Sequence, residues 1–516
     1  MIALAIDQGT TSTRAVLVDA DGRVEVAASR PNPASHPRDG WVEQDAERLL
    51  DDVRRCLEAG LDAVGRRAGD ARGAGATVVG IDNQGESCLA WDADTGRAVS
   101  PVISWQDRRT ADAVARLEAD GAGALVRARA GLPLDAYFSA AKLGWIVTEL
   151  PEAGRLAARG RLRLGTTDAF FRDRLTGRFE TDVTTASRTS LMNLERGAWD
   201  EELCALFGVP VDALPAIGPS AGDLGTLGAG GRDVPLGASL VDQQASLYGH
   251  GCRERGDAKM TFGTGAFASA VVGAAMPADR PDADDGPGRG PDEGPGDGPG
   301  GPLPTVAWRR EGEATVHALD GGVHAAAAAV EWARGLGLFA ELAELDRFEG
   351  PSAIERGVAF VPALVGLGCP HWDRRARGAW LGLGPATDAR DLARAVLEGV
   401  ALRMAEVVAS IERLVPLNGP IPVDGGMAAN PAFTDFLSAA LGRELLVSDE
   451  PELTALGTAM LAAEAIGRPI ARERSGRRVA AEPLPAEAHR AFTAAREAVA
   501  RFGATAGTSP SERVAS

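Results

Sequence analysis

Residues 1–19 read MIALAIDQGTTSTRAVLVD and contain two apolar runs around a short polar stretch. Residues 1–7 and 14–19 have the length and apolar content of β-strands, and residues 8–13 between them are typical of a tight turn. Gly9 lets the backbone turn and lets a ligand approach it closely. The stretch therefore predicts an antiparallel hairpin with a polar tip.

The tip of this hairpin carries groups that suit phosphate. Thr10, Thr11 and Ser12 offer hydroxyls and consecutive N–H groups to anionic oxygens. Asp7 ends the first strand, where its carboxylate can hold Mg²⁺ through water. A plain polar β-turn explains the same residues, so the hairpin alone does not decide between the two interpretations.

Length and charge limit the classes of function. A chain of 516 residues is too long for one core, so we expect at least two domains. The net charge of -18 argues against a nucleic-acid partner or an acidic membrane surface. It does not argue against ATP, because backbone amides, Mg²⁺ and a few basic side chains meet phosphates locally.

The cysteines and the apolar runs indicate a compartment. Five cysteines, odd in number and far apart, favour reduced thiols. The sequence has no run of transmembrane length and no signal-peptide pattern at its start. We expect a cytoplasmic protein that does not bind membranes.

The elements after the hairpin indicate an α/β domain. Asp21-Gly22 is typical of a second hairpin turn, leading to a third strand over residues 24–28. Apolar residues at helical spacing predict a helix over residues 46–65, and residues 77–81 read as a buried fourth strand. Three antiparallel strands, a helix and a buried strand are the opening of a ribonuclease-H-like domain.

After the fourth strand, the chain contains three candidate polyol-binding residues, which are Glu86, Trp105 and Tyr137. Glu86 follows the carboxyl end of that strand, where open α/β sheets place ligands, and it can accept hydrogen bonds from two neighbouring hydroxyls. Trp105 and Tyr137 can pack an aromatic face and place a hydroxyl against sugar-alcohol carbons. The alternatives are a solvated loop acid for Glu86 and a core position for Trp105.

Asp242 is the candidate for the chemistry. It follows a short apolar strand at residues 238–241 and opens a helix over residues 243–249, so its carboxylate is expected at a strand end. A helix N-cap is the structural alternative. Further on, residues 259–270 mirror the first hairpin, and Thr264 and Gly265 at its turn can meet phosphate oxygens, unless this is a plain hairpin turn.

The remaining stretch mixes regular elements with a biased segment. Residues 276–304 are almost wholly Pro, Gly, Asp, Ala and Arg, which predicts a disordered surface loop. We expect a helix over residues 323–336 and a small-residue helix over residues 454–465. Near residue 424 a strand runs into glycines that let a flat base approach, and Asn430 can bind its edge or simply cap the next helix.

Several motifs in order carry a family resemblance. They are Asp7-Gln8-Gly9-Thr10-Thr11-Ser12-Thr13-Arg14, Gly40-Trp41-Val42-Glu43-Gln44-Asp45, Trp105-Gln106-Asp107-Arg108-Arg109-Thr110, the 137–145 stretch, Ala186-Ser187-Arg188-Thr189, Val241-Asp242-Gln243-Gln244-Ala245, Phe262-Gly263-Thr264-Gly265-Ala266-Phe267, Gly378-Ala379-Trp380-Leu381-Gly382-Leu383 and Asp424-Gly425-Gly426-Met427-Ala428-Ala429-Asn430. Over residues 1–470 the chain resembles the FGGY carbohydrate kinases, and within them the glycerol kinases, because so many motifs keep their order and spacing.

The resemblance implies a fold and a reaction. The fold is α/β, with two actin-like (ribonuclease-H-like) domains that close on a central cleft. It implies a sugar-binding domain over residues 1–250, a nucleotide-binding domain over residues 251–470, and a helix and tail over residues 471–516. The reaction is ATP-dependent phosphorylation of a polyol or small sugar, with ATP and Mg²⁺ as cofactors and a homodimer as the expected assembly.

The resemblance also implies roles for residues. Asp242 matches the base that accepts the proton of the attacking hydroxyl. By the same resemblance, the acceptor-binding residues are Glu86, Trp105, Tyr137, Asp242, Gln243 and Phe267. The nucleotide-binding residues are Thr10, Thr11, Ser12, Arg14, Thr264, Gly265, Gly426 and Asn430, and the metal-binding residue is Asp7.

The chain departs from the family pattern at a few positions. Gly85 stands where glycerol kinases usually carry an arginine, which predicts weaker glycerol binding or a longer polyol or ketose (erythritol, xylulose or ribulose type) as substrate. Ala327 and Glu331 replace a glycine and a glutamine for the nucleotide, and Asp233 replaces an arginine of an allosteric loop. A non-catalytic sugar sensor and an actin-like or chaperone-like ATPase are rival functions, but neither needs all of these motifs together.

Overall fold

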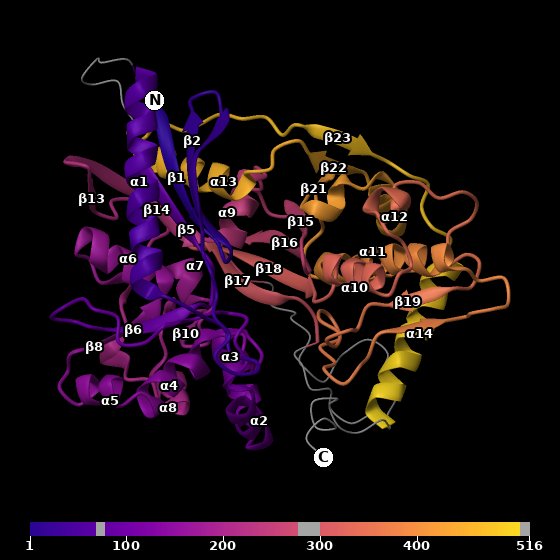
Figure 1. Cartoon of the computed structure of the whole chain (residues 1–516), viewed down its shortest axis with the longest axis horizontal. Coiled ribbons are helices and arrows are strands. Elements are labelled where there is room, and N and C mark those ends of the chain that lie inside the picture. The colour runs from indigo at the N-terminus through magenta and orange to yellow at the C-terminus, as the bar shows by residue number, and fades with distance from the viewer. Residues whose placement is uncertain (69–77, 277–299, 506–516) are drawn as a thin grey trace. The chain divides into compact units, whose positions relative to one another are not determined.

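The computed structural model describes residues 1–68, 78–276 and 300–505, which form two compact units (Figure 1). Unit 1 comprises Met1–Gly251, Pro304–His317 and Glu452–Glu473, and unit 2 comprises the described parts of Cys252–Leu303, Ala318–Pro451 and Arg474–Ser516. We expected boundaries at residues 250 and 470, whereas the contacts place two later segments in unit 1.

A six-stranded sheet lies at the centre of unit 1, in the order β13-β14-β5-β1-β2-β3. Its strands are β1 (Ile2–Gln8), β2 (Ser12–Asp19), β3 (Val24–Pro31), β5 (Val78–Asn83), β13 (Thr226–Ala229) and β14 (Arg232–Val241). The predicted hairpin is the antiparallel pair of β1 and β2, and β5 runs parallel to β1. Strands β1 and β5 are buried on both faces, and all but the last two residues of each strand are apolar.

Helix α1 (Ala46–Ala68) packs against this sheet, as Figure 1 shows. A Cβ on Gly60 would lie 2.6 Å from the Leu4 side chain, so the glycine allows the helix to lie close to β1. The other elements of this part are β4 (Glu43–Gln44), β6 (Cys88–Asp92), β7 (Val102–Ile103), α2 (Ala111–Ala119), α3 (Gly123–Ala130), α4 (Ser139–Glu149), α5 (Pro151–Ala157), β8 (Leu162–Thr166), α6 (Thr167–Thr176), β9 (Glu180–Asp182), α7 (Val183–Ala186), β10 (Met192–Asn193), β11 (Ala198–Trp199), α8 (Glu201–Phe207), η1 (Val211–Ala213), β12 (Ala216–Gly218) and α9 (Asp242–Gly249).

Helix α13 (Leu453–Ala465) belongs to unit 1 although it follows most of unit 2 in the chain. A Cβ on Gly457 would lie 1.9 Å from the Ala245 carbonyl oxygen, and one on Gly249 would lie 2.0 Å from the Leu453 carbonyl oxygen. Glycines at both contacts let α9 and α13 approach backbone to backbone. The prediction of a closely packed small-residue helix is confirmed.

Unit 2 repeats the strand pattern of unit 1. In its sheet β18, β16, β15, β21, β22 and β23 follow one another, with β15 antiparallel to β16 and parallel to β21. The elements of the second half of the chain are β15 (Ala258–Phe262), β16 (Ala266–Gly273), β17 (Leu303–Trp308), β18 (Val316–Val323), α10 (Ala327–Gly335), η2 (Leu342–Leu345), β19 (Ala359–Val361), β20 (Ala379–Leu381), α11 (Ala389–Glu412), β21 (Ile421–Asp424), η3 (Gly426–Ala429), α12 (Pro431–Leu441), β22 (Leu445–Ser448), β23 (Gly476–Val479) and α14 (Ala486–Thr505).

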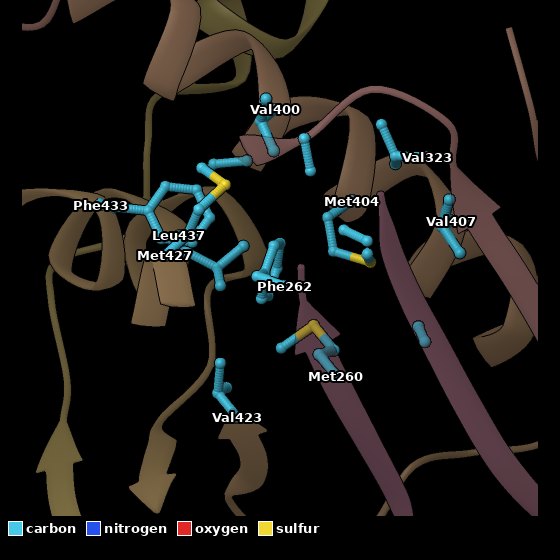
Figure 2. Close-up of a cluster of buried hydrophobic side chains, with 14 of the residues drawn as sticks. Met260, Phe262, Val323, Val400, Met404, Val407, Val423, Met427, Phe433 and Leu437 are labelled. Atoms are coloured by element: carbon cyan, nitrogen blue, oxygen red, sulfur yellow. The ribbon is translucent and has the colours of Figure 1, made fainter. Parts of the chain in front are cut away.

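The core of unit 2 lies where its sheet meets α11 and α12 (Figure 2). Phe262 and Phe433 are fully buried and pack edge to face, with ring centroids 4.9 Å apart. Met404 of α11 is also fully buried in this cluster. Burial of large apolar side chains from strand and helix holds the strand ends of unit 2 in place.

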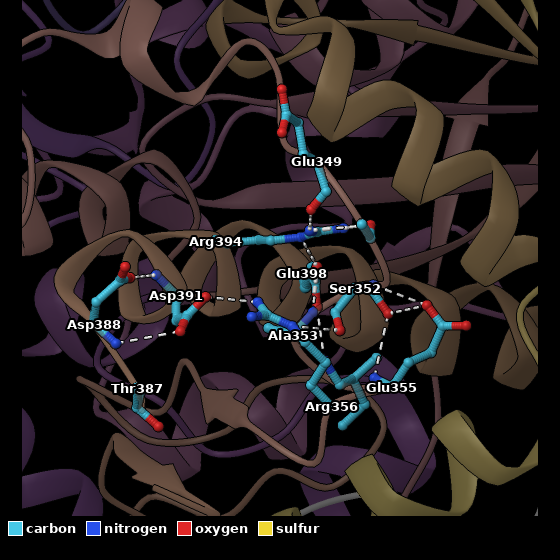
Figure 3. A network of polar contacts seen from close by, with 12 residues as sticks. Glu349, Ser352, Ala353, Glu355, Arg356, Thr387, Asp388, Asp391, Arg394 and Glu398 are labelled. Atoms are coloured by element: carbon cyan, nitrogen blue, oxygen red, sulfur yellow. Dashed lines mark hydrogen bonds and ion pairs between the residues drawn. The ribbon is translucent and has the colours of Figure 1, made fainter. Parts of the chain in front are cut away.

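A polar network fixes an irregular segment on α11 (Figure 3). The buried Glu398 carboxylate accepts hydrogen bonds from the backbone N–H groups of Ala353 and Ile354, at 2.9 and 3.0 Å, and from Arg394 at 2.7 Å. Burial raises the pKa of Glu398, and the N–H donors and Arg394 act against that rise. These bonds provide partners for a charge that would otherwise be costly to bury.

Helix α10 starts later than the sequence predicts. The helix predicted over residues 323–336 is wrong at its start, because Val323 ends β18 and α10 begins at Ala327. The alanine run gave no period to separate strand from helix. Most of the predicted disordered loop at residues 276–304 lies outside the described residues. No helix within residues 1–68, 78–276 and 300–505 is long and apolar enough to cross a membrane.

Candidate active site

The turn between β1 and β2 is held from outside by two side-chain amides. Asn32 donates to the Gly9 carbonyl oxygen at 2.8 Å, and Gln44 donates to the Thr10 carbonyl oxygen at 2.8 Å. Thr11 is exposed at the tip of the turn. The backbone conformation is therefore fixed while hydroxyl groups remain accessible, which suits an anion-binding turn.

Two carboxylates hold Arg14, the predicted phosphate contact. Its guanidinium is ion-paired with Asp7 and with Glu452, the latter at 2.7 Å between Nη1 and Oε1. Burial acts to lower the pKa of Arg14, but the charges of Asp7 and Glu452 outweigh it, so that the pKa is raised. Glu452 directly precedes α13, so a segment far along the chain contributes to the environment of the first hairpin.

Three aspartates approach one another at the ends of the central strands. Asp82 of β5 is in register with Asp7 of β1, and it accepts a hydrogen bond of 2.7 Å from Thr458. Burial raises the pKa of Asp82 well above its usual value, and the nearby charges of Asp7 and Asp242 add to the rise. Carboxylates crowded in this way favour a cation beside them.

The donor set fits Mg²⁺ of the kind that accompanies a nucleotide. Mg²⁺ is usually held by one or two carboxylates, with phosphate oxygens and waters completing its shell. Within the described ranges no group of three His, Cys, Asp or Glu side chains has the geometry of a complete metal site. A Mg²⁺ ion held by the Asp7 carboxylate, with phosphate oxygens and waters in the rest of its shell, needs no complete protein site of this kind.

Asp242 is the first residue of α9 and does not cap the helix. The cap position is Val241, and the Asp242 carboxylate accepts a hydrogen bond of 2.7 Å from the neighbouring Gln243 N–H. Both Asp242 and Gln243 are partly exposed at the end of β14. The N-cap alternative is therefore wrong, and the Asp242 carboxylate lies directly after the end of β14.

Trp105 and Tyr137 form an aromatic pair next to the turn between β1 and β2. Their ring centroids lie 5.6 Å apart at an interplanar angle of 66°. The Trp105 indole N–H donates to the Thr10 hydroxyl at 2.9 Å. Both rings are partly exposed, so Trp105 is not a core residue, and the pair offers an apolar surface beside the turn.

Glu86 is buried and paired with an arginine from a distant part of the chain. Arg188 donates to the Glu86 carboxylate through Nε at 2.6 Å, and both side chains are less than a tenth exposed. Glu86 also has a left-handed backbone, with φ of 59°. The solvated loop acid considered from the sequence is therefore wrong, because buried charge requires the partner that Arg188 supplies.

Sequence reasoning assigned no role to three residues of this site, Arg188, Asp82 and Lys142. Arg188 lies 102 positions from Glu86, and no local pattern links the two. Asp82 and Lys142 have sequence neighbours typical of a strand end and an amphipathic helix. The motifs that contain Arg188 and Lys142 gave a signal, but neither motif indicated what its charged side chain contacts.

The second hairpin gives unit 2 its own polar turn. Its backbone is closed by the Gly263 N–H, which donates to the Gly265 carbonyl oxygen at 2.9 Å, and Thr264 is exposed at the tip. A Cβ on Gly265 would lie 3.1 Å from the Val323 carbonyl oxygen. Phe267, a predicted substrate residue, lies on β16 and therefore in unit 2 with this turn.

The remaining predicted nucleotide residues follow β21 in unit 2. Gly426 is exposed, and a Cβ there would meet nothing within 4 Å. The Asn430 carbonyl oxygen of the side chain accepts from the Phe433 N–H at 2.7 Å and caps α12, while its amide donates to Asp346 at 3.0 Å. Asp346 and Pro431 line a cavity of about 340 Å³ beside this turn. The cap of α12 accounts for the side-chain oxygen of Asn430. The open space at Gly426 leaves room for a ligand.

Most of the chain matches the two domain models of one family of known proteins. Residues 2–249 match the N-terminal domain, and residues 299–466 the C-terminal domain, of the FGGY family of carbohydrate kinases. The chain belongs to this family. The predicted resemblance and the two-domain α/β kinase fold are thereby confirmed, and the protein is an ATP-dependent carbohydrate kinase with a small-molecule acceptor.

Individual relatives and solved structures of other proteins support the same family assignment. It is 40% identical over 467 residues to a glycerol kinase of Xanthobacter autotrophicus, with 89% of each chain covered. It is 41% identical over 461 residues to a glycerol kinase of Thermus brockianus, with 88% of each covered. The crystal structure of Plasmodium falciparum glycerol kinase with ADP matches with a TM-score of 0.84 and 25% identity, covering 97% of this chain and 98% of that one. Xylulose kinase from Rhodospirillum rubrum shares the fold with a TM-score of 0.81 and 24% identity, covering 98% and 100%.

Proposed function

We propose that this FGGY kinase transfers the γ-phosphate of ATP to a hydroxyl of glycerol, giving glycerol 3-phosphate and ADP. The observation that carries the proposal is the grouping in unit 1 of the Trp105–Tyr137 pair with the buried Glu86 carboxylate. An apolar wall suits the carbons of a polyol, and a carboxylate accepts hydrogen bonds from its hydroxyls. The curated relatives at about 40% identity act on glycerol by name, which supports the same acceptor.

In this proposal Asp242 is the catalytic base. Its carboxylate accepts the proton of the attacking hydroxyl while Gln243 orients the acceptor. Arg14 and the turns at Thr10–Ser12 and Thr264–Gly265 contact the phosphates. Gly426 and Asn430 bind the adenine of ATP, and Phe267 lies over the carbons of the acceptor. Mg²⁺, held from Asp7, would neutralise charge on the phosphates. A homodimer and a cytoplasmic location remain predictions.

A coupled assay for ADP release tests the acceptor. Glycerol, erythritol, xylitol, ribulose and xylulose are compared at saturating Mg²⁺-ATP. We expect turnover of glycerol with a KM above the micromolar range, because Gly85 supplies no donor beside Glu86. A higher kcat/KM for a longer polyol or a ketose would favour the alternative substrate class, and micromolar KM for glycerol would exclude it.

Asp242→Asn tests the base. We expect kcat to fall by about 10²- to 10⁴-fold because the amide cannot accept the proton, while nucleotide affinity is kept. Asp212→Asn, at an exposed aspartate of the same unit, is the matched control and should behave as the wild type. Turnover by Asp242→Asn at the rate of the control would refute the assignment.

A further inference from the structure

Lys142 is a buried cation in the first turns of α4. Its side chain is fully buried in unit 1, and Nζ donates to the Tyr137 carbonyl oxygen at 2.8 Å and to the Ser104 carbonyl oxygen at 3.3 Å. Burial lowers the pKa of Lys142, and the surrounding Cys88 and carboxylates, of which Glu86 is one, act against this. A lysine is costly to bury, so apolar packing alone does not explain it.

The two carbonyl groups belong to the segments that carry the aromatic pair. Ser104 directly precedes Trp105, and the other carbonyl is that of Tyr137 itself. The rings of Trp105 and Tyr137 are partly exposed, yet their backbones are joined through one ammonium group. One ammonium group therefore links the two segments that carry the rings.

The same part of α4 contacts the segments that carry Glu86 and Arg188. The Ser139 hydroxyl donates to the Glu86 carbonyl oxygen at 3.0 Å, where the backbone is left-handed. The Ala140 N–H donates to the Thr189 carbonyl oxygen at 2.8 Å, next to Arg188. Segments near residues 86, 105, 137 and 188 thus converge on the start of α4, and Lys142 supplies the charged contact among them.

We infer that Lys142 is a positioning residue of the acceptor site, which sets the spacing of Trp105 and Tyr137 and so determines affinity for the polyol without touching it. The inference rests on the proposed function, since it takes the aromatic pair as the polyol-binding wall. It goes beyond that function because it predicts a selective effect of a side chain that contacts neither substrate. A purely structural lysine would affect stability, and both substrates to a similar extent.

The test compares Lys142→Met, which removes both donated bonds at similar length, with Lys142→Gln, which keeps an N–H donor. For Lys142→Met we expect KM for the polyol to rise by about 10- to 100-fold, because small displacements of binding groups have effects of this size. KM for ATP should stay within about 2-fold of wild type. Lys142→Gln should lie between Met and wild type, showing rescue by a donor.

Two controls keep the result decisive. Thr148→Ala, at an exposed position on the same helix, should leave both KM values unchanged. Thermal unfolding of each variant shows whether it folds, and if Lys142→Met does not, the Lys142→Gln variant carries the comparison. A folded Lys142→Met variant with wild-type KM for the polyol, or with equal rises in both KM values, overturns the positioning role of Lys142. Such a result leaves the proposed function standing. Absence of turnover by the wild type with every acceptor overturns the proposed function and this inference together.

Discussion

Gly85 is the residue at which this chain packs closely against the segment that carries the candidate base. A Cβ built there would lie 3.1 Å from Val241 Cγ1, and Val241 directly precedes Asp242. The backbone of Gly85 is not left-handed, so a side chain can be accepted after a small shift of Val241. Arg188 already provides Glu86 with a guanidinium partner. Glu86 therefore has a charged partner without an arginine at position 85. What the glycine changes is the volume beside the acceptor and the number of donors that face it.

Gly85→Arg should shift acceptor preference toward glycerol. The new side chain fills space and offers donors to short polyols, so we expect the ratio of kcat/KM for glycerol to that for xylitol to rise by about 10-fold. Gly85→Ala, which adds only the Cβ, is the control and should change the ratio little. The substrate panel described above measures both, and an unchanged ratio in a folded Gly85→Arg variant would contradict the prediction.

Two neighbouring glycines at the end of β21 have different tasks. Gly425 has φ of 93°, and a Cβ there would lie 2.3 Å from the Phe262 carbonyl oxygen. Gly426, one residue later, has open space in the direction of a Cβ. The first glycine is required by the turn itself, whereas the second is free to face a ligand.

Alanine at each position separates fold from binding. Gly425→Ala should lower the free energy of unfolding by about 2–4 kcal/mol, since it combines left-handed strain with a clash against backbone. Gly426→Ala should change stability by less than about 0.5 kcal/mol but raise KM for ATP by about 10-fold, because it blocks approach to the turn. Urea unfolding and steady-state kinetics measure the two effects. Equal stability of both variants would show that the turn tolerates a side chain at Gly425.

At the scale of the molecule, a segment late in the chain completes the first unit. Glu452 pairs with Arg14 of β2, and Thr458 donates to Asp82 of β5, so α13 and the residue before it contact two strands of the central sheet. Both contacts lie within unit 1. The candidate acceptor residues other than Phe267 also lie in unit 1, and Thr264, Gly265, Gly426 and Asn430 lie in unit 2.

Hydrogen exchange on the whole protein tests this division. A polyol alone should protect amides near residues 86, 105, 137 and 242, because the proposed acceptor contacts are there. Mg²⁺-ADP alone should protect residues 263–267 and 425–431 and the first hairpin turn, since ligands stabilise the states that bind them. ADP with a metal chelator is the control for the hairpin at Asp7. Protection of residues 425–431 by the polyol alone would contradict the assignment.

Local patterns predicted much of the frame. The hairpin of β1 and β2, the buried β5 and the amphipathic α1 all follow from apolar period and turn residues, which act over short distances. The start of α10 could not be predicted this way, because alanines fit a strand end and a helix equally well. The return of α13 to unit 1 depends on glycines at residues 249 and 457 meeting across a long separation.

Ordered motifs and strand-end residues are local features, so they were enough to predict the family, the two hairpin turns and the candidate base. Three contacts became apparent only in the folded chain: Arg188 with Glu86, Glu452 with Arg14, and Lys142 with the backbones beside Trp105 and Tyr137. No local pattern could predict these contacts, because a buried charge needs a partner in space and these partners come from segments far apart in the chain.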